Sequence, residues 1–211
     1  MSKKKKLILE AATALFNEHG YYQVTIRMIA LKLNMSSGNL NYHYKNREDI
    51  FEAIYFEMVS VFDERIEKLD NTEISIAQIR SDIKQSMIRM MDYKFFWTDL
   101  YNLLGVSDKV RTHFQEAYKN RVAGCFLLFE KMKKQNLMKD SSFALEYEFL
   151  TERMINYGNT WIYSSGLYLN RFTAIHIENQ VNTLLSMLYP FLTLRGQKEF
   201  KDLLPELFNN T

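Results

Sequence analysis

Hydrogen-bonding side chains are concentrated in the stretch SSGNLNYHYKNR, residues 36–47. Leu40 and Tyr44 are its obvious apolar anchors, and a spacing of four residues puts them on one face of a helix. The other side then carries the amide, hydroxyl and imidazole groups of Ser37, Asn39, Asn41, Tyr42 and His43. Asn can make paired hydrogen bonds to adenine, and Ser, Tyr and His can donate to phosphates or base edges. This set of side chains suits a DNA groove.

Donors suited to the phosphate backbone surround this segment. They come from Thr25, Arg27, Ser36, Tyr42, His43, Lys45 and Arg47. Lys45 and Arg47 also precede a long predicted helix, whose N-terminus is itself an anion site. Such contacts would position the protein on a duplex without reading its sequence.

Two short helices joined by a tight turn must position these side chains. The first has an apolar stripe at helical spacing, formed by Ile26, Ile29, Ala30 and Leu33. Asn34 tolerates a left-handed backbone and ends that helix. Ser36 is a natural N-cap for the second helix, residues 37–44. The pattern predicts a helix-turn-helix, although spacing alone also fits an ordinary helical hairpin with a polar outer face.

The segment resembles the DNA-binding end of TetR/AcrR-type bacterial transcriptional repressors. The family pattern is matched at Thr25, Ile29, Ala30, Ser36, Gly38, Leu40, His43, Lys45, Glu48 and Asp49. Conservative matches are Met35, Tyr44, Arg47 and Ile50. Residues 8–25 also resemble the first helix of the family and its glycine–aromatic exit. The sequence departs from the pattern at Asn34, where the family usually has Gly, and at Asn41, where it usually has Tyr.

The resemblance favours the helix-turn-helix over the hairpin. It implies a DNA-binding regulator, a repressor by family habit, that binds a palindromic operator as a homodimer. The predicted DNA-binding residues are Thr25, Arg27, Ser36, Ser37, Gly38, Asn39, Asn41, Tyr42, His43, Lys45 and Arg47. Asn41 removes the phosphate contact that the family makes from that position, and together with Asn39 it is expected to change which bases are read.

Charge is unevenly distributed along the chain. The 211 residues have a formal net charge of +2, yet residues 1–47 hold eight Lys and Arg against two Glu, a charge of +6. A basic end on a mildly acidic body is typical of a protein that presents one end to phosphates. The run Lys3–Lys6 is expected to form an arm that adds sequence-independent attraction.

The single cysteine, Cys125, indicates a reducing compartment, because it leaves no disulfide within the chain. The amphipathic N-terminus is not a signal peptide, and no apolar run approaches membrane-spanning length. We therefore expect a soluble, cytoplasmic protein without a membrane partner.

An all-α fold is expected, because strand-like alternation is absent and only seven Gly and two Pro interrupt the chain. A three-helix helix-turn-helix DNA-binding domain, residues 1–50, would be followed by a larger helical ligand-binding and dimerisation domain, residues 51–211. Further helices are predicted at 47–70, 75–93, 95–104, 107–136, 142–165, 173–194 and 197–208, with the first ended by residues 71–73.

Met and aromatic residues are dense between residues 83 and 168. Such stripes ordinarily pack a core, but they also suit a mostly apolar small-molecule ligand with few polar anchors, which the resemblance implies. The candidate ligand-binding residues are Met87, Met91, Trp97, Tyr101, Phe126, Tyr157 and Trp161. Candidate polar anchors are Asn156, Asn159 and Thr160.

The last two long helices carry more apolar residues than one buried stripe needs. These are Tyr163, Leu167, Val181, Leu184, Leu185, Leu188 and Phe191. Two copies of such a helix pair form a four-helix bundle with two-fold symmetry. This homodimer would hold two recognition helices about one DNA turn apart, and ligand would change their spacing through the helix that starts near Arg47.

Two other functional classes compete with this interpretation. An enzyme is disfavoured because the histidines (His19, His43, His113 and His176) are scattered, and no phosphate loop, zinc-ligand spacing or nucleophile elbow is present. No catalytic residue, metal or cofactor is therefore expected. The alternative is a helical ligand-binding or scaffolding protein without sequence-specific DNA binding, which salt-insensitive binding to a protein partner would favour.

Overall fold

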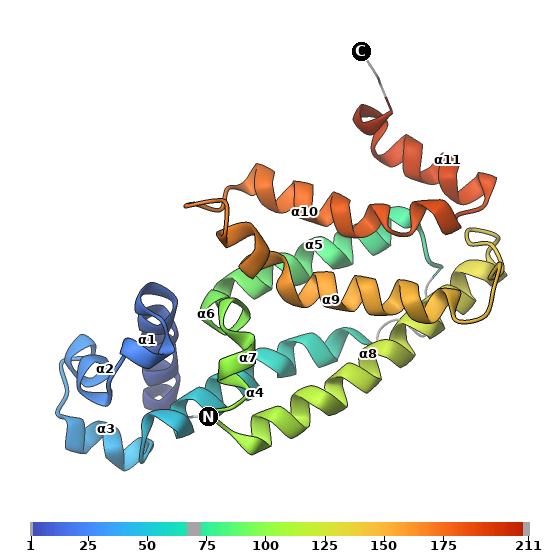
Figure 1. The fold of residues 1–211 in the computed structure, drawn as a ribbon. Coiled ribbons are helices and arrows are strands. Elements are labelled where there is room, and N and C mark those ends of the chain that lie inside the picture. Colours follow the sequence, from blue (N-terminus) through green and yellow to red (C-terminus); the bar gives the residue numbers. More distant parts are fainter. Residues whose placement is uncertain (1, 67–72, 209–211) are drawn as a thin grey trace. The chain divides into compact units, whose positions relative to one another are not determined.

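The protein is built from α-helices (Figure 1). The computed structural model describes residues 2–66 and 73–208. Its helices are α1 (Lys3–His19), α2 (Ile26–Lys32), α3 (Ser37–His43), α4 (Arg47–Ile66), α5 (Ile76–Asp92), α6 (Lys94–Thr98), α7 (Leu100–Leu103), α8 (Asp108–Lys134), α9 (Glu146–Gly166), α10 (Ala174–Ser186) and α11 (Leu194–Leu203). Short 3-10 helices follow at Tyr21–Gln23, Tyr189–Phe191 and Pro205–Leu207. The described ranges contain no strand beyond one isolated bridge, Met138 to Leu192. The all-α prediction is confirmed.

The chain divides into two compact units. The first unit comprises Met1–Glu67 and Asp92–Gln115, and the second comprises Lys68–Met91 and Glu116–Thr211. The first unit thus adds α4, α6, α7 and the start of α8 to the three N-terminal helices. The functional division at residue 50 stays a prediction. No helix of the described residues is long and apolar enough to cross a membrane.

The run of four lysines is helical, which corrects the prediction of an arm. Ser2 caps α1, because its hydroxyl oxygen accepts a hydrogen bond from the Lys5 N–H at 3.3 Å. The helix therefore begins at Lys3, five residues before the predicted start at Ile8. It ends at Gly20, whose φ of 79° is a conformation that favours glycine.

Two predicted helix boundaries in the second half of the chain are wrong. The helix expected from Ser142 begins only at Glu146, because the Glu146 carboxylate accepts from the Ser142 N–H at 2.5 Å and Leu145 is left-handed. The helix expected to run to residue 194 ends at Ser186. Thr193 then caps a separate helix, α11. The aromatic segment at 95–104 is likewise two helices, α6 and α7. The predicted break at 71–73 falls largely outside the described residues.

Aromatic rings fill the core of the first unit. The ring centroids of Phe16 and Phe95 are 5.1 Å apart, which joins α1 to α6. Asn17 adds a polar clamp beside them: its amide donates to the Asp92 carbonyl at 2.7 Å, and its oxygen accepts from the Phe95 N–H at 2.9 Å. Further along α4, the Tyr55 hydroxyl lies 2.9 Å from His113 Nδ1 of α8. The helix-turn-helix region therefore belongs to a larger packed unit.

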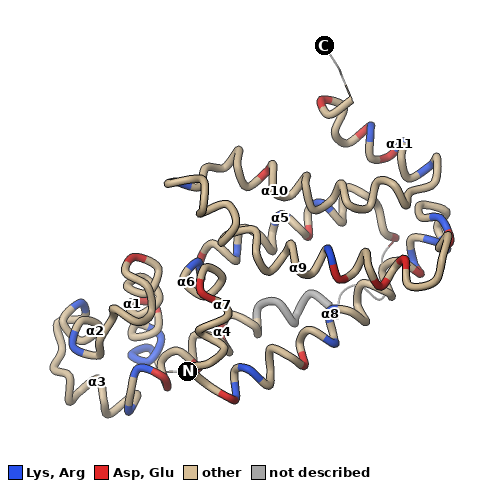
Figure 2. Tube along the Cα trace, viewed as in Figure 1, with Lys and Arg blue, Asp and Glu red and all other residues tan. Residues whose placement is uncertain are grey.

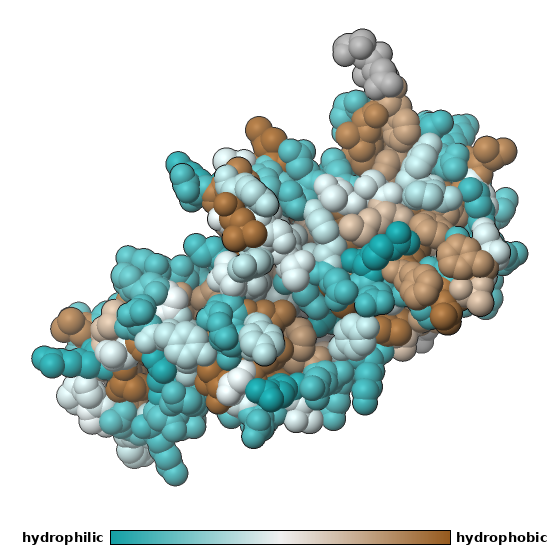
Figure 3. Space-filling view, in the orientation of Figure 1, coloured by the Kyte–Doolittle hydropathy of each residue, from teal (hydrophilic) through white to brown (hydrophobic). Residues whose placement is uncertain are grey.

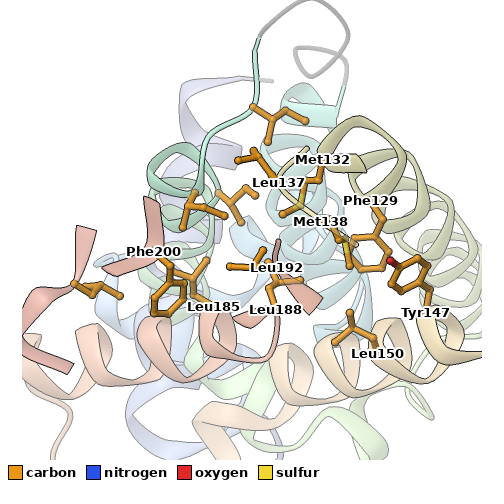
Figure 4. Close-up of a cluster of buried hydrophobic side chains, with 14 residues drawn as sticks. Phe129, Met132, Leu137, Met138, Tyr147, Leu150, Leu185, Leu188, Leu192 and Phe200 are labelled. Carbon is orange, nitrogen blue, oxygen red and sulfur yellow. The ribbon is translucent and has the colours of Figure 1, made fainter. Parts of the chain in front are cut away.

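The core of the second unit is formed by α5, α8, α9, α10, α11 and their connections (Figure 4). The side chains labelled there are Phe129, Met132, Leu137, Met138, Tyr147, Leu150, Leu185, Leu188, Leu192 and Phe200. Val181, Leu185 and Leu188 are completely buried within the chain. Their predicted place on a dimer face is wrong, because their apolar surface is already covered by the chain itself.

Gly196 allows α11 to approach this core. A Cβ at that position would lie 2.3 Å from the Leu137 carbonyl oxygen and 3.1 Å from Leu192 Cβ. The same Leu137 oxygen accepts a hydrogen bond from the Thr193 N–H at 3.0 Å, which fixes the two segments together. Only glycine fits between them without a shift of backbone.

Arg47 connects the start of α4 to the segment that follows α1. One of its terminal nitrogens, Nη1, lies within 3.1–3.2 Å of the carbonyl oxygens of Tyr21, Tyr22 and Val24. The guanidinium carbon also lies 4.2 Å from the centre of the Tyr21 ring. Burial raises the pKa of Tyr21 to about 12, so its hydroxyl remains protonated and donates to Glu48 at 3.3 Å.

We expect Arg47→Ala to lower the free energy of unfolding by about 1.5–3 kcal/mol, because hydrogen bonds from a charged group are lost and three carbonyls lose their donor. Arg47→Lys should recover little of this, since an ammonium lacks the planar fork and stacks poorly. Urea denaturation measures both. Lys45→Ala, at an exposed position two residues away, is the control and should change stability by less than about 0.5 kcal/mol. An unaltered Arg47→Ala transition would contradict this role.

Candidate nucleic-acid interface

Local hydrogen bonds form α2, the turn and α3 as the sequence predicts. The Thr25 hydroxyl oxygen accepts from the Met28 N–H at 3.3 Å, which caps α2. Asn34 has a φ of 52°, the expected left-handed turn residue. The Ser36 oxygen accepts from the Asn39 N–H at 3.1 Å, which caps α3. The predictions for Asn34 and Ser36 are confirmed.

Burial gives α3 one inner and one outer side. Leu40 is completely buried and Tyr44 is 8% exposed, as their spacing predicts. On the opposite side Tyr42 is 86% exposed. Gly38, Asn39 and Asn41 are also exposed, whereas Ser37 and His43 are half-buried. The segment between Ser36 and Tyr44 contains no Lys, Arg, Asp or Glu, so this outer side offers neutral hydrogen-bonding groups only.

Several predicted phosphate donors lie exposed around α3. Arg27, Lys45 and the two capping residues, Thr25 and Ser36, are all exposed. A hydroxyl that accepts a capping hydrogen bond keeps its own proton, so both caps can still donate to a phosphate. Arg47 differs from these residues, because its guanidinium is already engaged by backbone carbonyls and the Tyr21 ring.

The first turn of α1 adds a basic cluster beside the end of α3. Lys5 Nζ lies 5.4 Å from the centre of the Tyr44 ring, at the residue that ends α3. Figure 2 shows the basic residues at the start of α1. Lys6 is partly offset by Glu10, 4.0 Å away. One signal in the sequence, the N-cap residue Ser2, indicates that the lysines begin a helix. The prediction of an arm overlooked this signal.

The candidate ligand residues are divided between the two units. Trp97 and Tyr101 belong to the first unit, and Tyr101 is 91% exposed. The other five belong to the second unit: Met87, Met91, Phe126, Tyr157 and Trp161. Of these, Met87 and Trp161 are buried, and the Trp161 indole N–H points to Met90 Sδ at 3.5 Å.

A hollow on the second unit has different walls. Its volume is about 620 Å³, and its lining is Phe143, Glu146, Phe149, Glu152, Arg153, Asn156 and Phe191. Only Asn156 among these was a predicted anchor. Elsewhere in the second unit, Thr151 Oγ1 and His176 Nε2 are buried without a hydrogen-bond partner. Within the described residues, no group of three His, Cys, Asp or Glu could hold a metal ion.

Two family models match the chain. The model described as "Bacterial regulatory proteins, tetR family" matches residues 8–54. The model described as "Bacterial transcriptional repressor", also of TetR type, matches residues 57–200. The first covers α1 to α3 and the start of α4, and the second covers most of the remaining helices.

Relatives and solved structures agree with these models. The uncharacterized HTH-type transcriptional regulator YhgD of Bacillus subtilis (strain 168) is 26% identical over 91 residues, 43% of this chain and 46% of YhgD. The match thus spans about half of that relative. A TetR-family transcriptional regulator from Marinobacter aquaeolei VT8 has a TM-score of 0.86 at 21% identity, with complete coverage of both chains.

AibR, in a crystal structure with isovaleryl coenzyme A and operator DNA, has a TM-score of 0.66 at 18% identity, with coverage of 90% of this chain and all of AibR. At such identities, this structure and that of the Marinobacter regulator show a shared fold. The repressor model, however, spans more than half of the sequence. The protein therefore belongs to the TetR family of bacterial transcriptional regulators.

Proposed function

We propose that this protein is a repressor that binds a palindromic operator as a homodimer and is released by a small, mostly apolar ligand. The observation that carries the proposal is the outer side of α3, which is exposed, uncharged and rich in hydrogen-bonding groups. Solvent exposure alone does not explain an uncharged helix surface of this composition. It is suited to base edges in the major groove.

In this proposal, phosphate contacts come from exposed donors that surround α3. Lys45, Arg27 and the cap hydroxyls of Thr25 and Ser36 are exposed there. The lysines of the first turn of α1 add attraction that does not depend on base sequence. Arg47 acts in this scheme as a positioning residue, because it holds the start of α4 against the exit of α1 rather than reaching outward.

Dimerisation is assigned to the exposed side of α9 and α10. Apolar residues remain uncovered there, with Tyr163 51%, Leu167 59% and Ile175 75% exposed. Figure 3 shows hydrophobic surface over the connection between these helices. Apolar surface of this extent, next to small polar residues such as Thr160 and Ser164, supports a helix-pair interface with a second copy.

Ligand binding is assigned to the second unit. AibR contains isovaleryl coenzyme A and operator DNA in one structure, which supports a fold that serves both partners. The buried, unpaired Thr151 Oγ1 and His176 Nε2 would supply polar anchors for such a ligand. A tenfold release requires about 1.4 kcal/mol of coupling between the two sites. If compounds that raise the melting temperature left operator affinity unchanged, this part of the proposal would be rejected.

DNA binding should depend steeply on salt. The double variant Lys4→Gln/Lys5→Gln is expected to reduce the slope of log affinity against log salt by about two on any duplex, because each lysine neutralises a phosphate. Fluorescence anisotropy over a salt series measures the slope. Lys119→Gln/Lys134→Gln, at exposed positions of α8, is the matched control and should leave it unchanged. Equal slopes for all three proteins would show that Lys4 and Lys5 do not contact phosphates.

The dimer interface is tested with paired leucine substitutions. Leu167→Arg should convert the dimer to monomers, because a charge is placed in a desolvated apolar contact. Leu194→Arg, at a position 86% exposed on α11, should leave it dimeric. Light scattering coupled to gel filtration gives the mass of each. Dimers that tolerate both substitutions would place the interface elsewhere.

A further inference from the structure

Three side chains form the outermost surface of α3. Because residues on an α-helix advance by about 100° each, Tyr42 lies nearly opposite the buried Leu40. Asn39 and Asn41 then lie on its two flanks, and both are exposed. Among the described residues, neither carboxamide is hydrogen-bonded to the protein; the Asn39 contact with the Ser36 side chain is made by its backbone N–H. Both carboxamides are free to bind another molecule.

The residue types on this surface restrict which bases can be read. Guanine is most often recognised by two donors of Arg or Lys, and cytosine by a carboxylate acceptor. α3 contains neither kind of side chain. A carboxamide offers one donor and one acceptor, the complement of N7 and the N6 amino group of adenine. An aromatic ring can instead contact the methyl group of thymine.

The basic residues near α3 are not part of that helix. Arg27 belongs to α2, and Lys45 follows the end of α3. Neither side chain therefore belongs to the helix whose outer side is formed by Asn39, Asn41 and Tyr42. Arg47 is held by three backbone carbonyls. Base contacts made by α3 itself are therefore left to its neutral side chains.

We propose that α3 selects A·T base pairs, with Asn39 and Asn41 each making paired hydrogen bonds to one adenine and the Tyr42 ring contacting a thymine methyl group. This specificity rests on the proposed function, since it requires α3 to enter the major groove. It identifies the half-site as A·T-rich where α3 lies. The two asparagines are its specificity-determining residues.

The test begins with duplexes selected from a random library by the full-length protein. Adenines of the selected half-site are replaced one at a time by 7-deazaadenine, which pairs with thymine but lacks the N7 acceptor. Two positions should each lose about tenfold in affinity. Asn39→Ala should abolish the loss at one of them and Asn41→Ala at the other. Uracil in place of thymine should weaken binding to the parent protein but not to Tyr42→Ala.

Matched controls separate specificity from general damage. Asn120→Ala changes an exposed asparagine of α8. Its affinity should respond to each modified duplex as that of the parent protein does. 7-Deazaguanine at neighbouring guanines should have no effect. A half-site of G·C pairs beneath α3, or full affinity for 7-deazaadenine duplexes, would overturn the inference while leaving operator binding intact. Failure to select any duplex would overturn the proposed function and this inference with it.

Discussion

The helix-turn-helix depends on one guanidinium. α2 and α3 have seven residues each, far below the length at which an isolated helix is stable in water. Their inner residues, such as Ile29 and Leu40, supply burial, but the outer side of α3 supplies none. Arg47 closes the segment by binding the carbonyls of Tyr21, Tyr22 and Val24. Because the two ends of this segment are joined, the chain between them loses little conformational entropy when it binds a partner.

That closure continues into helices distant in sequence. Asn17 binds the turn between α5 and α6 through Asp92 and Phe95, and Tyr55 contacts His113 in the first turns of α8. The first unit therefore has polar contacts to elements that lead directly into the second. On the proposed mechanism, a ligand that shifts the starts of α6 or α8 acts on these contacts.

Sequence reasoning succeeded where a single residue determines local structure. Asn34 and Ser36 act on the backbone within three residues, so their roles could be predicted without the rest of the fold. It failed where the partner was distant. Helical spacing marks Leu185 as apolar but does not say whether its own chain or a second copy covers it. Similarly, a cation is visible in the sequence at Arg47, whereas its acceptors, carbonyls 23–26 residues away, are not.

The uncharged outer side of α3 and the basic residues around it would contribute differently to DNA binding. The first would provide selectivity and the second would provide affinity. On the proposed function, the lysines at the start of α1 attract any duplex equally, and so they contribute nothing to the choice among sequences. Two paired carboxamide contacts per half-site give roughly 2–6 kcal/mol of discrimination, at about 1–3 kcal/mol each. Specific regulators are distinguished from non-specific binding by about 4–10 kcal/mol. One copy reaches only the lower part of that range, whereas two copies, at roughly 4–12 kcal/mol, span it. The main benefit of the proposed dimer is thus sequence selectivity, since the basic residues already provide attraction to DNA.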